Sequence, residues 1–513
     1  MAAPEIPRYL PLQGSPHAQN CRTGDNLSIR GLHLAHRPGC SAGSVAFQEV
    51  AMSLSGTVAT TSSGGTSAGE APVTWAGGLP SIRTLDDATT FLYQRLGASR
   101  DGHGARAGVA RARALCETLG DPQDRCRSVH VAGTAGKGSV VAFVAGLLGA
   151  HGFTVGAHLS PHAHSIVERF LLDGRAVAEH LLVRTLVDLM PGIGRIARSE
   201  HGCPTFFEVT NAIASQLFAD GEADYAVVET GLGGRLDSTN TITRADKLAL
   251  LTHIGLDHTE VLGDTLAEIA TEKAGIMPRH GHVIALKSQC EAVDQVFVEE
   301  AAGRRCTLEL FDPSDPSSPP FVERELGLPG RHQVVNAALA LRAVAYLAQR
   351  DGWRIDPTAV HRGLRQVRLP GRFERRRWHG HPVVLDGAHN PIKLGSVVSV
   401  LRDEHPGQRF VWVLAFKGNK DVRAALEIIA PVASAVVATE FVTTGGDHRP
   451  AGASVPAAAL AGAARRAGVP VSTDAAHPGA ALQRALELSA PGRPVVAAGS
   501  FHLVAAIGDI LSA

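Results

Sequence analysis

Hydrophobic and polar positions along this chain form short apolar runs that alternate with longer helical segments. Ser128–Ala132, Asp224–Glu229 and Leu248–His253 are short apolar runs, which predicts buried strands. The apolar segment 138–150 follows the first of them across a glycine-rich turn, and Asp264–Met277 carries its apolar residues at helical spacing. Strands that alternate with helices predict an α/β fold with a parallel sheet covered by helices on both faces.

The same alternation restarts beyond Pro370, after a proline-rich loop at 311–320. The strands predicted there are Val383–Asp386, Phe410–Ala415, Ala435–Thr439 and Pro494–Ala498. This pattern predicts a larger domain over residues 77–370 and a smaller one over residues 371–513.

Residues 1–76 are rich in Ser, Gly, Thr and Ala, a composition that cannot bury enough apolar surface to stay ordered. We expect a disordered extension without a catalytic role. An organelle transit peptide is an alternative, although Glu5, Asp25 and Glu49 weaken it. A second alternative is an upstream extension, with the functional start at Met52.

Charge and cysteine content narrow the class of protein. Acidic and basic residues balance at 49 each, and the isoelectric point is about 7.4, which argues against a dominant surface for nucleic acid or anionic membranes. The longest apolar run, Val140–Ala150, is too short to span a bilayer. Seven scattered cysteines without a CxxC pair favour a reducing compartment, and we expect a cytoplasmic protein.

Lysine is scarce, because only seven of the 49 basic residues are lysine and the rest are arginine. A lysine inside a motif therefore suggests chemistry that arginine cannot perform. One such lysine lies in the glycine-rich turn Gly133–Ser139, between a predicted strand and a predicted helix. Glycines let the backbone approach a phosphate, the helix N-terminus adds partial positive charge, and Lys137 reaches the outer phosphates. This turn predicts a nucleotide site, with an ordinary strand–helix turn as the alternative.

Three polar clusters follow the glycine-rich turn. Ser160 and Glu208 offer the oxygen ligands that Mg²⁺ prefers, and His258 is a less usual partner. Taken singly, Glu208 also suits a solvated helix charge, His258 a capping or core histidine, and Lys273 an exposed lysine. The other histidines, including His162 and His164, are interpreted as loop residues.

In this order, the motifs resemble those of the folylpolyglutamate synthase/dihydrofolate synthase family, which belongs to the Mur-ligase-like ATP-dependent amide ligases. The matching segments are HVAGTAGKGS (130–139), SPH (160–162) with Glu168-Arg169, PTFFEV (204–209), ETGLGGRLDSTN (229–240), IGLDHTEVLGDTLAEIATEKAGI (254–276), HQVVNAALAL (332–341), LPGRFE (369–374), LDGAHNP (385–391) and GSFHLV (499–504).

The resemblance implies a P-loop ATPase domain, a smaller Rossmann-like domain, and a cleft between them for ATP and substrate. It implies that L-glutamate is joined to a dihydropteroate or reduced-folate carboxylate through an acyl phosphate, with release of ADP and phosphate, by a monomer. ATP would be held by Ala135, Gly136, Lys137, Gly138, Ser139, Asn336, Arg372 and Asp386. Magnesium would be held by Ser160, Glu208 and His258. Lys137, His258 and Lys273 would be catalytic, and Lys273 would be carbamylated by CO₂.

Two departures leave alternatives open. Relatives usually carry Asn at the position of Ala135, and Leu159 replaces a Thr before the SPH motif, in a loop that borders the pterin site. A Mur-type ligase that acts on a cell-wall nucleotide precursor is one alternative. A nucleotide-binding protein without ligase chemistry is the other.

Overall fold

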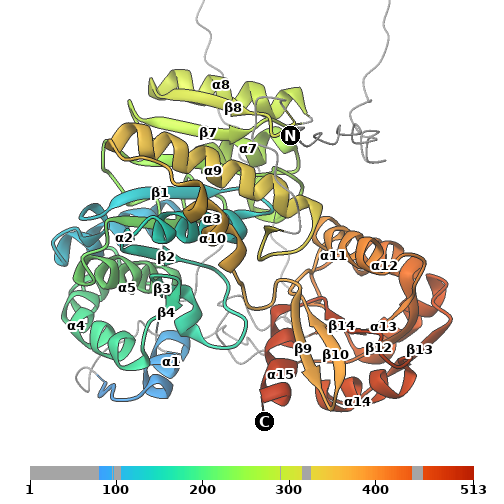
Figure 1. The fold of residues 1–513 in the computed structure, drawn as a ribbon. Coiled ribbons are helices and arrows are strands. Elements are labelled where there is room, and N and C mark those ends of the chain that lie inside the picture. Colours follow the sequence, from blue (N-terminus) through green and yellow to red (C-terminus); the bar gives the residue numbers. More distant parts are fainter. Residues whose placement is uncertain are drawn as a thin grey trace, which may run out of the picture. The chain divides into compact units, whose positions relative to one another are not determined.

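The computed structural model describes residues 80–94, 96, 105–288, 290–314, 325–441 and 454–512, and these belong to one compact unit. Two β-sheets with flanking helices build this unit (Figure 1). The predicted disordered extension over residues 1–76 lies outside the described residues. The α/β class predicted from the sequence is confirmed.

The larger sheet has the strand order β4-β3-β2-β5-β1-β6-β7-β8. Its strands are β1 (Arg127–Ala132), β2 (Val155–His158), β3 (Phe170–Leu172), β4 (Arg175–Ala176), β5 (Tyr225–Glu229), β6 (Leu248–Leu251), β7 (His282–Leu286) and β8 (Thr307–Phe311). Neighbouring strands in the run β2-β5-β1-β6-β7-β8 are parallel. Strands β3 and β4 extend the sheet at one edge as antiparallel strands. Strands β1 and β5 are buried almost throughout, which explains their uninterrupted apolar sequence.

Helices cover both faces of this sheet (Figure 1). On one face, the apolar helix α3 (Lys137–Ala150) packs against α9 (Arg331–Asp351) and α10 (Pro357–Gln366). The opposite face carries α1 (Leu85–Gln94), α2 (Ala105–Thr118), α4 (Glu179–Ala197), α5 (Phe206–Asp220), α7 (Leu266–Ala274) and α8 (Glu291–Arg304). Short helical segments are η2 (Pro122–Asp124), η3 (Ile166–Arg169) and α6 (Thr259–Leu262).

The smaller sheet has the order β13-β12-β11-β14-β10-β9. Its strands are β9 (Glu374–Trp378), β10 (His381–Leu385), β11 (Phe410–Leu414), β12 (Ala433–Ala438), β13 (Val471–Asp474) and β14 (Val495–Ala498). One face is covered by α11 (Pro391–Glu404), α12 (Val422–Ile429) and α13 (Ala457–Arg466), and the other by α14 (Pro478–Leu488) and α15 (Phe501–Ser512). A short turn, η5 (Ala430–Val432), precedes β12. Pro370, where the sequence pattern restarts, lies between α10 and β9.

Every strand predicted from an apolar run is present, with shifted ends. The run Leu248–His253 forms a strand only to Leu251, and the helix predicted over 264–277 spans Leu266–Ala274. Thr265 caps that helix by accepting a hydrogen bond from the backbone N–H of Glu268, which fixes its first turn. The edge strand β9 was not predicted, because its sequence ERRRW lacks an apolar face.

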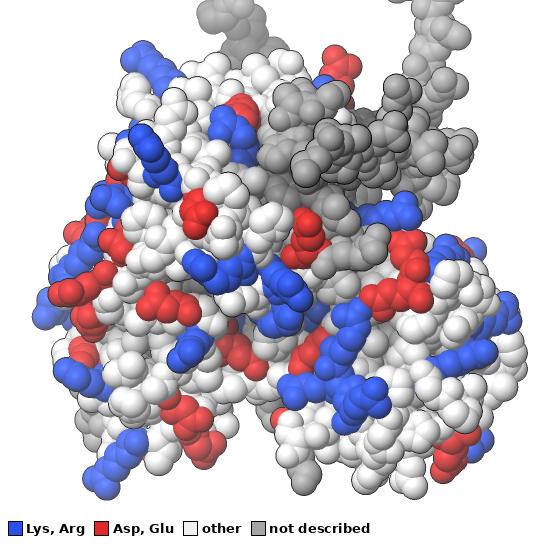
Figure 2. All heavy atoms as spheres, in the orientation of Figure 1, with Lys and Arg blue, Asp and Glu red and all other residues white. Residues whose placement is uncertain are grey.

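On the face drawn in Figure 2, acidic and basic side chains are interspersed, as the overall balance of charge suggests. No helix among the described residues is long and apolar enough to cross a membrane. The five cysteines within the described ranges are free thiols.

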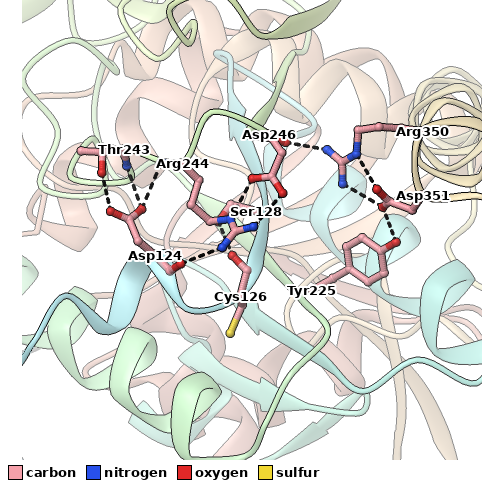
Figure 3. Close-up of polar contacts among 9 residues, drawn as sticks. All are labelled: Asp124, Cys126, Ser128, Tyr225, Thr243, Arg244, Asp246, Arg350 and Asp351. Atoms are coloured by element: carbon pink, nitrogen blue, oxygen red, sulfur yellow. Dashed lines mark hydrogen bonds and ion pairs between the residues drawn. The ribbon is translucent and has the colours of Figure 1, made fainter.

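A polar network ties together the starts of the central strands, at the edge of the larger sheet opposite their carboxyl ends (Figure 3). Arg244 bonds both oxygens of Asp246 at 2.7 Å and donates to the backbone carbonyl of Asp124 at 2.8 Å. On α9, Arg350 pairs with Asp351 at 2.7 Å, and the Tyr225 hydroxyl at the start of β5 donates to Asp351 at 2.6 Å. This network joins α9 to the strands that carry the site described below.

Tyr225→Phe removes the hydroxyl that donates to Asp351 and accepts from the Trp353 indole N–H at 3.2 Å. We expect the free energy of unfolding to fall by about 1 kcal/mol, because two partly buried polar groups lose a partner. Urea unfolding followed by circular dichroism measures this loss. Tyr346→Phe, whose ring stacks on His282 on the outer part of α9, is the matched control and should change stability by less than about 0.5 kcal/mol. Equal losses in the two variants would contradict the role of the network.

Candidate active site

A cavity of about 1940 Å³ lies beyond the carboxyl ends of β1, β5 and β6 and is also lined by residues that follow β10, β11 and β14. Carboxyl ends of parallel strands are where α/β proteins place their ligands. Five of the seven lysines of the chain line this cavity: Lys137, Lys273, Lys393, Lys417 and Lys420. In a chain that uses arginine elsewhere, this concentration of lysine marks the cavity as the candidate site.

The phosphate loop connects β1 to α3, as predicted. Gly136 occupies the N-cap position of α3 with a φ of 88°, so the helix begins at Lys137 with its N-terminal N–H groups facing the cavity wall. Gly138 and Ser139 are buried in the first turn. A Cβ on Gly136 would lie 2.4 Å from Oδ1 of Asn336, so this glycine allows α9 to approach the loop. The loop thus has the form of an anion-binding helix start.

Backbone and threonine contacts fix the rest of the loop. The Thr134 N–H donates to the His253 carbonyl at 2.8 Å, and its hydroxyl donates to the Gly255 carbonyl at 2.9 Å. The Thr252 hydroxyl donates to the carbonyl of Ala135 at 2.8 Å. Main-chain and threonine hydroxyl contacts to the segment at the end of β6 therefore hold the loop at Ala135.

Glu229, at the end of β5, faces the phosphate loop. Its Oε1 lies 3.9 Å from Nζ of Lys137, and its Oε2 accepts a hydrogen bond from the Ser160 N–H at 2.9 Å. Its side chain is 4% exposed, and burial raises its pKa, against the opposing effect of Lys137. This carboxylate joins two predicted residues, Lys137 and Ser160, in one group with oxygen ligands suited to a cation.

Glu208, which the sequence predicts for the metal site, lines the same cavity and already has a cationic partner. Arg111 on α2 donates to its two oxygens at 2.6 and 2.7 Å, and the Thr205 N–H donates to it at 2.9 Å. Glu208 therefore holds the start of α5 and pairs with a cation, and its assignment to the metal site stays a prediction. Glu229 is the carboxylate that accepts a hydrogen bond from the Ser160 N–H.

His258 caps the short helix α6 in the left-handed region, with a φ of 55°. Its Nε2 lies 3.9 Å from Asp257, which sequence reasoning did not assign. Lys393 and Lys420, from the second sheet's side, approach the same carboxylate at 3.3 and 3.7 Å, and Asn390 donates to it at 3.0 Å. Although burial alone would raise the pKa of Asp257, these cations hold it well below its usual range. Asp257 thus links the two halves of the cavity.

Lys273 is buried at the end of α7, with 4% of its surface exposed. Burial, together with the charges of Lys137 and Lys393, lowers its pKa to about 7, against the opposing effects of Asp257 and Asp237. A substantial fraction of this amine is therefore neutral and nucleophilic near neutral pH. The exposed lysine considered as an alternative is excluded by this burial.

Arg372, just before β9, and Asp386, just after β10, belong to the second domain and line the same cavity. The Arg372 guanidinium lies 4.7 Å from the ring centroid of Phe501. Both oxygens of Asp386 accept backbone hydrogen bonds, from Phe373 at 2.7 Å and from Ala388 at 2.8 Å. Burial raises the pKa of Asp386, and the charge of Arg372 opposes this. Asp386 therefore fixes the turn that presents Arg372 to the cavity.

An aromatic wall closes the cavity near α1 and α5. The ring of Tyr93 stacks on Phe206 at 5.0 Å, and the Arg169 guanidinium lies 5.1 Å from the same ring. The Arg169 Nε–H donates to Nδ1 of His162 at 2.8 Å, and the Tyr93 hydroxyl lies 3.0 Å from its Nε2. Phe207, edge-on to Phe206, lines the cavity. Such a wall suits a flat aromatic substrate.

Sequence reasoning missed Glu229, Asp257, Lys393 and Lys420. The first two lie inside motifs that were recognised, at or shortly after strand ends where ligands gather. The two lysines were signalled by the scarcity of lysine itself. The pairing of Arg111 with Glu208 had no signal, because it joins two helices far apart in the sequence.

The fold and the site define an ATP-dependent ligase of the Mur ligase class. The sequence profile of the Mur ligase glutamate ligase domain matches residues 371–501. A solved structure, folylpolyglutamate synthase of Mycobacterium tuberculosis complexed with ADP, is 30% identical and has a TM-score of 0.72. The match covers 84% of this chain and 98% of that one.

Two curated relatives narrow this class. The dihydrofolate synthase/folylpolyglutamate synthase of Bacillus subtilis is 31% identical over 378 residues, which is 69% of this chain and 85% of that protein. The enzyme of the same name from M. tuberculosis is 34% identical over 365 residues, covering 64% and 74% of the two chains. The chain belongs to the dihydrofolate synthase/folylpolyglutamate synthase family.

The two glutamates are distinguished by paired substitutions. Glu229→Gln should lower kcat by about a hundredfold and raise the magnesium concentration needed for half-maximal rate, because the charge beside Lys137 and Ser160 is lost. Glu208→Gln should keep the magnesium dependence but lower the free energy of unfolding by about 3 kcal/mol, because Arg111 loses its partner. ADP release assays across a magnesium series, with urea unfolding, measure both. A shifted magnesium dependence in Glu208→Gln alone would contradict this role of Glu229 and would support the predicted role of Glu208 as a metal ligand.

Proposed function

We propose that this protein joins the amino group of L-glutamate to a carboxylate of dihydropteroate or of a reduced folate, with ATP as the energy source. The observation that carries the proposal is the convergence in one cavity of the phosphate loop, Lys273 and residues of the glutamate ligase domain such as Lys393 and Arg372. The family relationship supports the identity of the acid and of the amine. We further propose a cytoplasmic monomer.

The reaction proceeds in two balanced steps. An oxygen of the substrate carboxylate attacks the γ-phosphorus of ATP, the bond to the β–γ bridging oxygen breaks, and ADP leaves. The glutamate amine then attacks the acyl carbon, loses a proton, and displaces inorganic phosphate. Phosphorylation is needed because a carboxylate is negatively charged and resonance-stabilised, and therefore a poor electrophile. The protein contributes mainly positioning and charge neutralisation.

The groups around the phosphate loop are suited to neutralise the negative charge of the ATP phosphates. In the proposed mechanism, the N–H groups at the start of α3 and Lys137 bind phosphate oxygens, with Gly136, Gly138 and Ser139 shaping the loop. Asn336 and Arg372 contact the nucleotide from α9 and from the second sheet's side, and Asp386 holds Arg372 in place.

Magnesium fits the donor set around Glu229. Ser160, Glu229 and His258 would hold it together with phosphate oxygens, and the hard oxygen donors of Ser160 and Glu229 suit this ion. When bound, magnesium offsets negative charge on the reacting phosphate. We propose Glu229 as the carboxylate ligand in preference to Glu208, which lines the same cavity but is paired with Arg111. His258 also orients Asp257, which keeps Lys393 and Lys420 beside the reacting groups.

The acid is proposed to lie along the aromatic wall. Phe207 offers an apolar surface to a flat ring, while Tyr93, His162 and Arg169, which also line the cavity, are fixed to one another. A carboxylate at the far end of such an acid would point toward the phosphate loop. The wall favours a pteroyl acid over a cell-wall nucleotide precursor, which has no comparable fused ring opposite its carboxylate.

Product analysis tests this function. The protein is incubated with ATP, magnesium and glutamate, and with dihydropteroate, tetrahydrofolate or a muropeptide precursor. We expect ADP release that depends on a pteroyl acid. Mass spectrometry should show one added glutamyl unit on dihydropteroate if the protein is a dihydrofolate synthase, and serial additions on tetrahydrofolate if it extends polyglutamate. Turnover with the muropeptide precursor alone, or ATP binding without ADP formation, would overturn the proposal.

We also propose that Lys273 is carbamylated. Its neutral amine would add to CO₂ with loss of one proton, giving a carbamate anion among the cationic groups of the cavity. Lys273→Arg keeps a positive charge but cannot form this group, so kcat should fall by about a hundredfold. Carbon-13 NMR after equilibration with labelled bicarbonate should show a carbamate resonance in the wild-type protein that is absent from this variant.

Lys247 provides the matched control. It is also 4% exposed, and burial lowers its pKa to about 8, but it does not line the cavity. Lys247→Arg should keep both the carbamate resonance and near-wild-type kcat. A wild-type rate in Lys273→Arg, or a resonance that persists in it, would show that carbamylation of Lys273 is not required.

A further inference from the structure

His164 belongs to the loop between β2 and η3, which also carries Ser160. This loop belongs to the domain of the larger sheet, and its backbone folds around the carboxylate of Glu168. That carboxylate accepts hydrogen bonds from the N–H groups of Ala163 at 2.7 Å, His164 at 3.1 Å and Ser165 at 3.2 Å. The loop therefore has a fixed shape, and a contact made by His164 is transmitted along it toward Ser160.

The His164 side chain reaches across to the elements of the second sheet. Its Nε2 lies 3.4 Å from Oε2 of Glu374, the first residue of β9. A Cβ on Gly508 of α15 would lie 2.1 Å from Cε1 of His164, so the ring packs directly on the helix backbone. A Cβ on Gly371 would likewise lie 3.3 Å from the side chain of Ala163. The loop is thus docked on two elements of the second domain.

Glu374 also connects His164 to the segment that carries Arg372. Its Oε2 also accepts a hydrogen bond from the N–H of Gly371 at 2.8 Å, and Arg376 bonds its Oε1 at 2.6 Å. Gly371 immediately precedes Arg372, which faces the cavity. A continuous path of contacts therefore runs from the loop of Ser160, through His164 and Glu374, to the segment that presents Arg372.

We propose that His164 is a positioning residue. Its contact with Glu374, called the clasp below, holds the Ser160 loop against the start of β9, so that Ser160 and Arg372 face the nucleotide together. This inference rests on the proposed function for its kinetic consequence, but not for its structural one. His164 does not touch the reacting groups, and it acts through Glu374.

The charges around His164 favour its protonated form. The hydrogen bond to Glu374 raises the pKa of His164, burial opposes the shift, Glu168 adds to it, and Arg376 opposes it. From α15, Asp509 lines the same cavity beside Gly508. Although burial alone would raise the pKa of Glu374, hydrogen bonds from His164, Gly371 and Arg376 lower it to about 2. The charged clasp is therefore present at low pH and weakens as pH rises through the raised pKa of His164.

A double-mutant cycle tests the clasp. His164→Gln, Glu374→Gln and the double variant are compared by kcat/KM for the acid substrate at pH 6 and pH 8.5. We expect His164→Gln to lose about tenfold at pH 6 and less at pH 8.5, with little further loss in the double variant. His180→Gln, an exposed histidine on α4, is the matched control and should match the wild type at both values. Additive losses, or equal losses at the two pH values, would overturn the proposal.

Hydrogen exchange supplies a readout that needs no turnover. In His164→Gln at pH 6, amide exchange should rise several-fold in both segments, 160–169 and 371–374, while His180→Gln leaves both unchanged. Faster exchange in 160–169 alone would show a local structural role and would contradict the clasp. If the wild-type protein ligates no pteroyl acid, the proposed function fails, and the exchange in 371–374 still decides the positioning role.

Discussion

The structure depends on the gathering of lysines in one cavity at one end of the larger sheet. Lys137, Lys273, Lys393 and Lys420 line this cavity, where Glu229 faces Lys137 and Asp257 faces Lys393 and Lys420. Burial and neighbouring cations lower the pKa of Lys273 to about 7 and of Lys393 to about 8. Burying lysine side chains costs free energy, and the phosphates of a bound nucleoside triphosphate would add anions beside them.

The fold brings these charges together through its connections. Parallel strands place the phosphate loop after β1, Glu229 at the end of β5 and Asp257 after β6 on one edge of the sheet. The second domain adds Arg372 from the segment before β9 and Lys393 from the first turn of α11, which follows β10. Because both domains contribute charge to one cavity, a ligand that binds there is held from both sides and shielded from water.

Much of this could be read from the sequence, and the exceptions have physical reasons. Apolar runs predicted β1, β5 and β6 because buried parallel strands need no polar positions. The ion pair of Glu208 with Arg111 could not be predicted, because Arg111 lies on a helix whose position depends on tertiary packing. Glu229 was missed because its strand reads as core, and its contact with Ser160 follows only from the pairing of β2 with β5. The burial of Lys273 could not be seen in a helix that also carries Glu268 and Glu272.

The central claim is that this cavity activates an acid by transferring phosphate to its carboxylate. Its most direct test is oxygen transfer from a pteroyl acid labelled with oxygen-18 in the reacting carboxylate, with ATP, magnesium and unlabelled glutamate. Phosphorylation of the carboxylate predicts that one labelled oxygen appears in inorganic phosphate for each amide formed. Amide formation with unlabelled phosphate would contradict the account.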